Sequence, residues 1–106
     1  MRQTQVHVYV KGDVIGVGFR AWMKIQAKLT GVNGWVRNTF DRPKFFDRAG
    51  GVEAVLSGEE GAVKQLIAII RKGSPIAQVD EVNVIHIEQK QEYKEFEIRA
   101  TKHTAV

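Results

Sequence analysis

The stretch VKGDVIGVGFR, residues 10–20, places three glycines just ahead of a single arginine. Gly16 and Gly18 can adopt positive φ angles, so the loop can curl until successive N–H groups converge on one anion. A helix that begins after the loop adds amides without an internal partner and the positive end of its dipole. Arg20 can offer a bidentate guanidinium to the same group. The candidate phosphate-binding residues are Ile15, Gly16, Val17, Gly18, Phe19 and Arg20.

A simpler interpretation stays open, in which the glycines form a tight turn and Arg20 is a solvated residue of the first helical turn. The helix dipole disfavours a cation at that position, which favours the anion-binding interpretation. A dinucleotide-binding motif fits poorly, because Ala21 stands where a third glycine often occurs. The chain also lacks the GK[ST] sequence of a Walker loop.

Asn38 is the second candidate, within the segment GWVRN at residues 34–38. It lies toward the carboxyl end of a predicted strand, at the sheet edge where the glycine loop also lies. A neutral carboxamide there can hold a water molecule, but from this segment alone we favour the simpler interpretation that Asn38 bonds the backbone where its strand ends. The histidines lack ligand spacing, so we expect no metal and no cofactor. They are His7, His86 and His103.

Length and composition predict one domain spanning residues 1–106. The formal net charge of +4 favours anionic partners only mildly, since the basic residues are scattered. No 18-residue apolar run and no signal-peptide pattern occurs, so we expect no membrane association. Cysteine is absent, which suits a reducing compartment, and we expect a cytoplasmic monomer.

The hydrophobic pattern predicts an α+β fold. Alternation over residues 6–10 indicates a strand, and Trp22, Ile25 and Leu29 indicate the apolar face of a helix over residues 19–29 that Gly31 ends. Ser57 and Glu60 fit a capping box for a second helix that ends near residue 71. The remaining predicted strands cover residues 35–39, 52–56, 82–87 and 94–100. This order predicts a ferredoxin-like βαββαβ sandwich, with two helices on one face of a mainly antiparallel sheet and an additional C-terminal strand.

The two segments at residues 12–20 and 34–38 together closely resemble the signature motifs of the acylphosphatase family. The resemblance extends from Val6 to Arg99, through VEAV at residues 52–55 and the GSP turn at residues 73–75. It implies hydrolysis of an acyl phosphate to a carboxylate and inorganic phosphate, without metal. It also implies that Arg20 binds the phosphate and that Asn38 positions the attacking water.

The sequence departs from the family pattern in two places. Ile15 stands in the loop where the family usually has glutamine, which is tolerable if the loop binds through its N–H groups. The segment DRPKFFDRAG, residues 41–50, replaces a short hairpin turn. Phe45 and Phe46 could pack over the pocket as a lid or fold back as a local cluster, and we favour the local cluster.

Two other classes of function remain open at this level. One is a non-catalytic phosphate-binding or RNA-binding domain, since RNA-recognition modules share this sheet. We do not expect RNA as a partner, because the predicted strand over residues 52–56 carries no aromatic residue for base stacking. The other is an acylphosphatase relative repurposed for carbamoyl phosphate or for partner binding.

Overall fold

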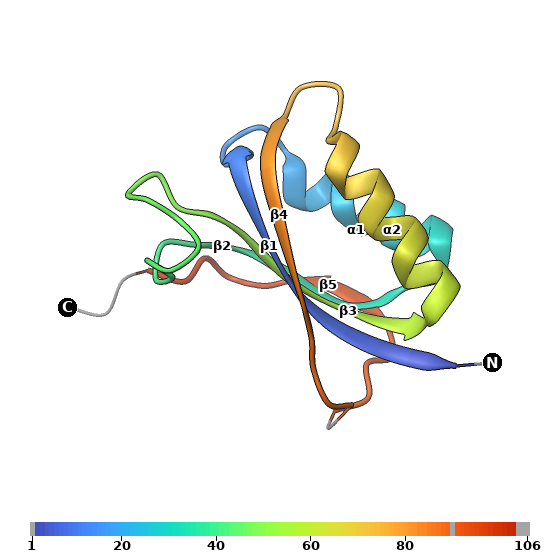
Figure 1. Ribbon diagram of the computed structural model, residues 1–106. Helices are drawn as coiled ribbons and strands as arrows, with labels where there is room; N and C mark the ends of the chain where they lie inside the picture. Colours follow the sequence, from blue (N-terminus) through green and yellow to red (C-terminus); the bar gives the residue numbers. More distant parts are fainter. Residues whose placement is uncertain (1, 90, 104–106) are drawn as a thin grey trace.

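The structure is a computed structural model that describes residues 2–89 and 91–103. Two helices lie on one side of a twisted five-stranded sheet (Figure 1). The elements are β1 (Gln3–Asp13), α1 (Phe19–Thr30), β2 (Asn33–Thr39), β3 (Gly51–Glu59), α2 (Glu60–Lys72), β4 (Gln78–His86) and β5 (Phe96–Ile98). The predicted ferredoxin-like sandwich with an additional C-terminal strand is therefore confirmed.

The sheet has the strand order β4-β1-β3-β2-β5. β3 pairs antiparallel with both β1 and β2, so these two strands run in the same direction without touching. The added strand β5 pairs parallel with β2 at the sheet edge. Since β1 and β2 run in the same direction, the loop that follows β1 and the carboxyl end of β2 lie at one end of the sheet.

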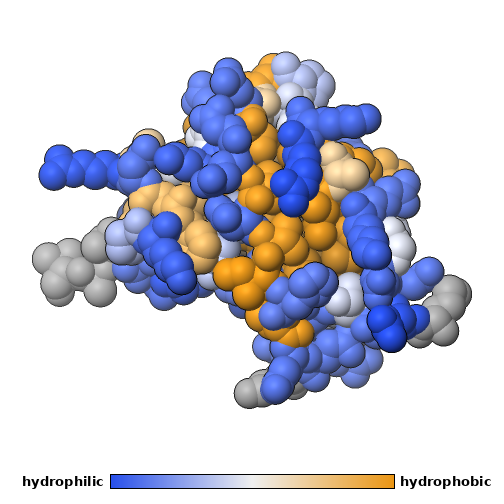
Figure 2. Space-filling model, in the orientation of Figure 1, coloured by the Kyte–Doolittle hydropathy of each residue, from blue (hydrophilic) through white to orange (hydrophobic). Residues whose placement is uncertain are grey.

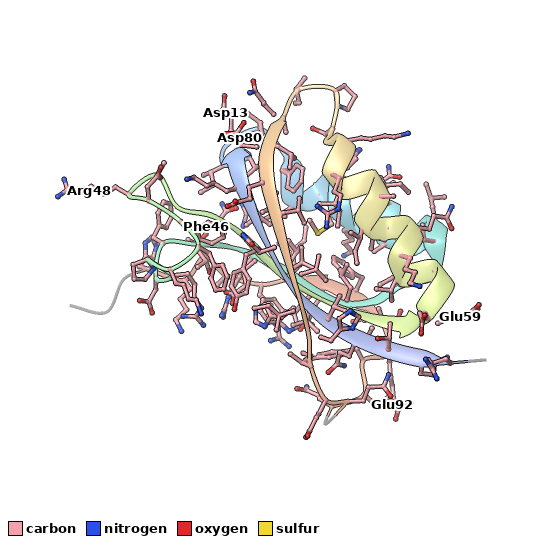
Figure 3. The ribbon with its side chains drawn as sticks, viewed as in Figure 1. Asp13, Phe46, Arg48, Glu59, Asp80 and Glu92 are labelled. Carbon is pink, nitrogen blue, oxygen red and sulfur yellow. The ribbon has the colours of Figure 1, made fainter. Side chains whose placement is uncertain are left out.

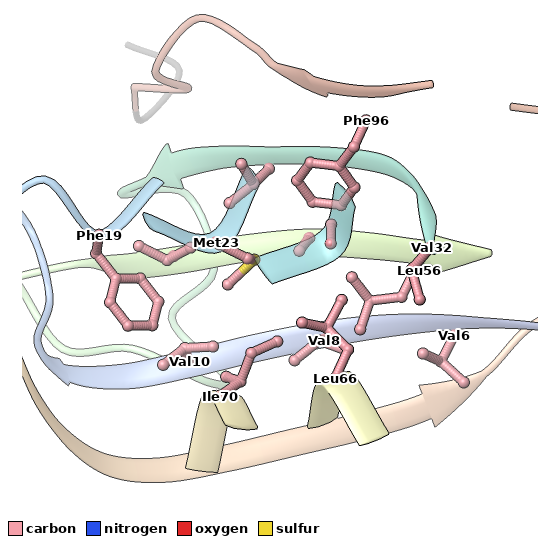
Figure 4. Packing of buried hydrophobic residues seen from close by; sticks show 14 of the residues in the cluster. Val6, Val8, Val10, Phe19, Met23, Val32, Leu56, Leu66, Ile70 and Phe96 are labelled. Carbon is pink, nitrogen blue, oxygen red and sulfur yellow. The ribbon is translucent and has the colours of Figure 1, made fainter. Parts of the chain in front are cut away.

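The hydrophobic core fills the space between the sheet and the helices (Figure 4). Alternate residues of β1 point into it, and Val6, Val8 and Val10 are all fully buried. Met23 of α1 and Leu66 of α2 meet them from the helical layer. This packing fixes the position of α1, and so the place where its first turn meets the sheet.

The buried face of α1 differs from the predicted one. Phe19, Met23 and Ala27 form its buried stripe, whereas Ile25 and Leu29 are 57% and 75% exposed. Both stripes have helical spacing, and the pattern within α1 does not reveal which one faces the sheet. The predicted end of the helix at Gly31 is confirmed, because Gly31 forms a left-handed cap at φ 79°.

The capping box predicted for the second helix is wrong. β3 continues to Glu59, and Ser57 pairs there with Gln5 of β1 and Asn33 of β2. The N-cap of α2 is Glu59, which makes no side-chain capping hydrogen bond. Other strand boundaries differ as well. β1 spans residues 3–13 instead of 6–10, β2 begins at residue 33 instead of 35, β4 begins at residue 78 instead of 82, and β5 covers only residues 96–98.

The segment between β2 and β3 folds back onto the face of the sheet that carries no helix. Phe45 stacks on Tyr9 with ring centroids 4.0 Å apart, and Phe46 lies edge-on to Tyr9 at 6.0 Å. Figure 3 shows Phe46 beside the strands and Arg48 projecting at the tip of the loop. These contacts match the local cluster that the sequence favoured over a lid.

β4 forms the edge of the sheet opposite to β5. Apolar residues gather along this strand and toward α2 (Figure 2). Val82 and Val84 are partly buried against the core, and Ile85 remains 42% exposed.

Within the described residues neither helix is long and apolar enough to cross a membrane.

Candidate functional site

A small hollow of about 180 Å³ lies where the N-terminus of α1 meets the carboxyl end of β2. Arg20 and Asn38, which the sequence analysis singled out from segments 18 residues apart, both line it. Its lining residues are Val14, Gly16, Gly18, Phe19, Arg20, Ala21, Asn38 and Ile98.

The glycine loop has the backbone conformation that an anion cradle needs. Gly16 and Gly18 adopt φ angles of 81° and 73°, and a Cβ atom on either would meet nothing within 4 Å. Both positions therefore require glycine because of their positive φ angles, and the space beside each glycine is open. Gly18 is also the N-cap of α1. The loop thus leads directly into the first turn of the helix.

The first turn of α1 is electrically suited to an anion. Its first intrahelical hydrogen bond runs from the Trp22 N–H to the Gly18 carbonyl at 3.0 Å, so the amides of residues 19–21 precede the helical ladder. No side chain caps the helix, and its first turn contains no acidic residue. The positive end of the dipole therefore faces the hollow without a neutralising carboxylate from its own turn.

Arg20 sits in the first turn and is partly exposed in the hollow. None of the ion pairs within the described part of the chain involves it. A guanidinium placed against the dipole and without a carboxylate partner is available to an incoming anion.

Asn38 presents a buried amide from the sheet side of the hollow. The residue is only 7% exposed, and its Oδ1 is buried without a hydrogen-bond partner. Its backbone is held from both sides, since Asn38 pairs with Val52 and its carbonyl accepts from the Lys102 N–H at 2.9 Å. A buried oxygen without a partner is costly unless a water or ligand completes it.

The side chains of Ile15 and Val17 do not line the hollow. Both are partly buried and pack against the hydrophobic core. An apolar residue at position 15 therefore fits its surroundings, and these two positions can contribute to the hollow only through their backbone.

Comparison with known proteins decides the family. The acylphosphatase family model matches residues 6–98. An acylphosphatase from Pyrobaculum aerophilum is 41% identical over 101 residues, covering 95% of this chain and 99% of its own. The chain belongs to the acylphosphatase family.

Solved structures of the family agree with this assignment. An acylphosphatase from Coxiella burnetii superimposes with a TM-score of 0.78 and 33% identity, covering 92% of this chain and 93% of its own. Full-length HypF in a phosphate- and nucleotide-bound form gives a TM-score of 0.81 at 27% identity, over 96% of this chain but only 12% of that one. The acylphosphatase fold therefore also occurs inside a much longer protein.

Sequence reasoning missed three residues of the hollow: Val14, Ala21 and Ile98. Val14 and Ala21 flank the predicted loop and could have been found by extending it. Ile98 comes from β5, whose position next to β2 depends on the sheet order. It is 42% exposed and gives the hollow an apolar rim.

A buried carboxylate on the other face of β2 and β3 was also missed. Glu53 is fully buried, and its Oε1 accepts from Arg37 Nε at 2.8 Å and from Thr39 Oγ1 at 2.9 Å. Its Oε2 lies 2.7 Å from His7 Nε2 and 3.6 Å from Arg42 Nε. We call these five residues the Glu53 network; Arg37 and Thr39 are the two neighbours of Asn38 in the chain.

The Glu53 network keeps its carboxylate ionised. Burial alone raises the pKa of Glu53, but hydrogen bonds from His7, Arg37 and Thr39 and the charge of Arg37 outweigh burial and lower that pKa to about 2. A charged residue inside the apolar run VEAVL, residues 52–56, was the signal in the sequence for a buried carboxylate. The sequence does not indicate which residues would pair with it.

Larger hollows exist elsewhere in the molecule. One of about 530 Å³ lies at the opposite end of the sheet, between Gln3, Ser57 and Tyr93. Its described lining contains Glu92 and no basic side chain, so it does not suit a phosphate group. Within the described residues no group of three or more histidine or acidic side chains is placed to hold a metal ion.

Proposed function

We propose that this chain hydrolyses acyl phosphates at the hollow between α1 and β2, with Arg20 binding the phosphoryl group and Asn38 positioning water. The observation that carries the proposal is one pocket combining an unpaired guanidinium, open positive-φ glycines at a helix N-terminus and an unpartnered amide oxygen. Family membership supports the same reaction.

The phosphoryl group is bound by the loop amides of residues 15–20 and by Arg20. The helix dipole and the guanidinium both stabilise the negative charge of its oxygens. These groups stay in place as charge redistributes during transfer, which is how preorganised donors lower a barrier.

The nucleophile is a water molecule whose hydrogen is accepted by Asn38 Oδ1. The water oxygen forms a bond to phosphorus while the bond from phosphorus to the acyl oxygen breaks, and that oxygen leaves with the electron pair as a carboxylate. One water proton passes to an oxygen of the transferring phosphoryl group, giving inorganic phosphate. A carboxylate is a good leaving group, so catalysis can rest on positioning and charge stabilisation.

The test is phosphate release from benzoyl phosphate, with and without EDTA, comparing the intact chain with Arg20→Gln. We expect turnover that is insensitive to EDTA, is abolished by Arg20→Gln, and changes little between mildly acidic and neutral pH because no catalytic group has to titrate there. A folded intact chain without turnover would overturn the proposal. A sharp bell-shaped profile in this range would point to a titrating catalytic group that we have not assigned.

The RNA-binding alternative is not favoured by the face of the sheet that carries no helix. Trp35 is 6% exposed, with the guanidinium carbons of Arg37 and Arg99 each 4.7 Å from its ring centroid. Tyr9 is 7% exposed and stacks on both His7 and Phe45. The ring faces that would stack on bases are already covered.

We also propose that the chain acts as a single-domain monomer in the cytoplasm. The cysteine-free sequence suits a reducing compartment. Light scattering coupled to size exclusion would test the oligomeric state against the 11.9 kDa mass of the chain.

A further inference from the structure

Two hollows lie along the seam between α1 and β5: the one that Arg20 and Asn38 line, which we call the phosphate hollow, and a second one farther along α1. Ala21 and Ile98 line the phosphate hollow, whereas Lys24 and Phe96 line the second one, of about 390 Å³. Ala21 and Lys24 are three residues apart on α1, and Ile98 and Phe96 are two apart on β5, so each pair shares a face of its element. The two hollows therefore succeed one another along the same seam.

The second hollow is positively charged. It is lined by three lysines and one carboxylate, and we call it the lysine groove. Its lining residues are Lys24, Ala27, Lys28, Gly31, Val32, Asn33, Lys94, Glu95 and Phe96.

The three lysines of the groove are exposed, and none of them belongs to an ion pair within the described part of the chain. Two come from successive turns of α1, at Lys24 and Lys28, and Lys94 approaches from the segment before β5. Basic groups that converge on a hollow and outnumber its one carboxylate raise the local concentration of anions there.

The spacing suits one small molecule that occupies both hollows. The helix rises about 1.5 Å per residue, so Lys24 and Lys28 lie about 6 and 12 Å along α1 from Arg20. Between the two charged ends the seam is apolar, formed by Ala21 and Ile98 at the phosphate hollow and by Phe96 beyond it. A short apolar spacer with an anionic group at each end matches this arrangement.

We infer that the lysine groove binds a second anionic group, a carboxylate or phosphate at the far end of the acyl moiety of the substrate. This inference rests on the proposed function, because it assigns the phosphoryl group to the hollow at Arg20. It makes the chain selective for acyl phosphates whose acyl part is itself anionic.

The test uses three substrates with the same reacting group. They are benzoyl phosphate, 4-carboxybenzoyl phosphate and the neutral analogue 4-carbamoylbenzoyl phosphate. An exposed ion pair contributes up to about 1 kcal/mol, which is about fivefold. With two lysines in reach we expect kcat/KM to be about three- to tenfold higher for the carboxylated substrate than for the carbamoyl one. The preference should shrink as salt rises from about 0.02 to 0.3 M.

Lysine variants locate the effect. The double variant Lys24→Gln/Lys28→Gln should bring the ratio of the two kcat/KM values close to one, and Lys94→Gln should lower it in part. Lys72→Gln is the matched control, because it neutralises an exposed lysine in the last turn of the other helix and should leave the ratio unchanged.

Two outcomes would overturn the inference: an intact chain that does not distinguish the carboxylated from the carbamoyl substrate, or a preference that survives the double variant. Failure of the proposed function looks different, since benzoyl phosphate would then not be turned over at all. In that case calorimetric binding of the two corresponding benzoylphosphonates, which cannot be hydrolysed, measures the same preference without turnover.

Discussion

Glu53→Gln is the substitution whose effect on stability the structure specifies most closely. In the folded chain the pKa of Glu53 lies at about 2, against an ordinary value of 4.5. Each pKa unit corresponds to about 1.4 kcal/mol, so the interactions of the ionised carboxylate stabilise the native state by about 3 kcal/mol at neutral pH. Glutamine keeps the size of the side chain but removes the charge that Arg37 and Arg42 require. We therefore expect Glu53→Gln to lower the free energy of unfolding by about 3 kcal/mol at pH 7.

The sign of the pH dependence follows from the lowered pKa. A group whose pKa is lower in the folded state stabilises that state above its unfolded pKa and loses the contribution as pH falls toward the folded pKa. The intact chain should lose this contribution between about pH 4.5 and pH 2, and less than half of it should remain by about pH 3. The difference between the intact chain and Glu53→Gln should shrink over the same range.

The assay is urea denaturation followed by tryptophan fluorescence at several pH values from 7 to 3. Glu97→Gln serves as the control, because Glu97 pairs with Arg99 at 2.8 Å on the same face but is exposed. An exposed pair contributes under about 1 kcal/mol, so this variant should stay close to the intact chain. A Glu53→Gln loss below about 1 kcal/mol at pH 7, or one that does not change with pH, would refute the reasoning.

Three further substitutions probe the site and the loop. Asn38→Ala should reduce kcat on benzoyl phosphate by about 100-fold with little change in inhibition by inorganic phosphate, and unreduced kcat would remove its assigned role. Gly16→Ala should lower the free energy of unfolding by about 1–2 kcal/mol because the φ of Gly16 is 81°, and not because a Cβ would be crowded. The control Gly61→Ala, within α2, should not destabilise the chain. Equal effects of the two substitutions would contradict this reasoning. Phe45→Ala removes the ring stacked on Tyr9 and should cost about 1–2 kcal/mol in thermal or urea denaturation, with benzoyl phosphate turnover within about twofold. A large change in KM or kcat would instead show that the loop acts on the pocket.

The clustering of the candidate site residues in one hollow could be predicted because most of them are close together in the sequence. Gly16, Gly18 and Arg20 lie within five residues, at the point where the loop passes into α1 and the helical apolar pattern begins. Asn38 required one more step, the expectation that its strand ends at the same edge of the sheet. Both inferences depend on short segments and on general features of helix and strand ends.

The features that were missed depend on which segments meet in space. Periodicity predicted the helix over residues 19–29 but did not decide between its two apolar stripes, so Ile25 and Leu29 were assigned to the wrong side. The partners of Glu53 come from β1, β2 and the loop after β2, and no spacing in the sequence connects them. Ser57 failed as a helix cap because strand pairing on both sides extended β3 past it.

The alternation of β2 links the two faces of the sheet. Asn38 points into the phosphate hollow, whereas its neighbours Arg37 and Thr39 point to the other face and bond the same oxygen of Glu53. The backbone at Asn38 is also hydrogen-bonded to β3 and to the segment after β5. Because the strand is held from both faces and both edges, the backbone that carries the unpartnered Asn38 oxygen is fixed in place before any substrate binds. In the reaction proposed above Asn38 orients one water, a role that depends on rigidity more than on a titratable group, and within the described residues the buried charge of Glu53 lies behind the hollow and not in it.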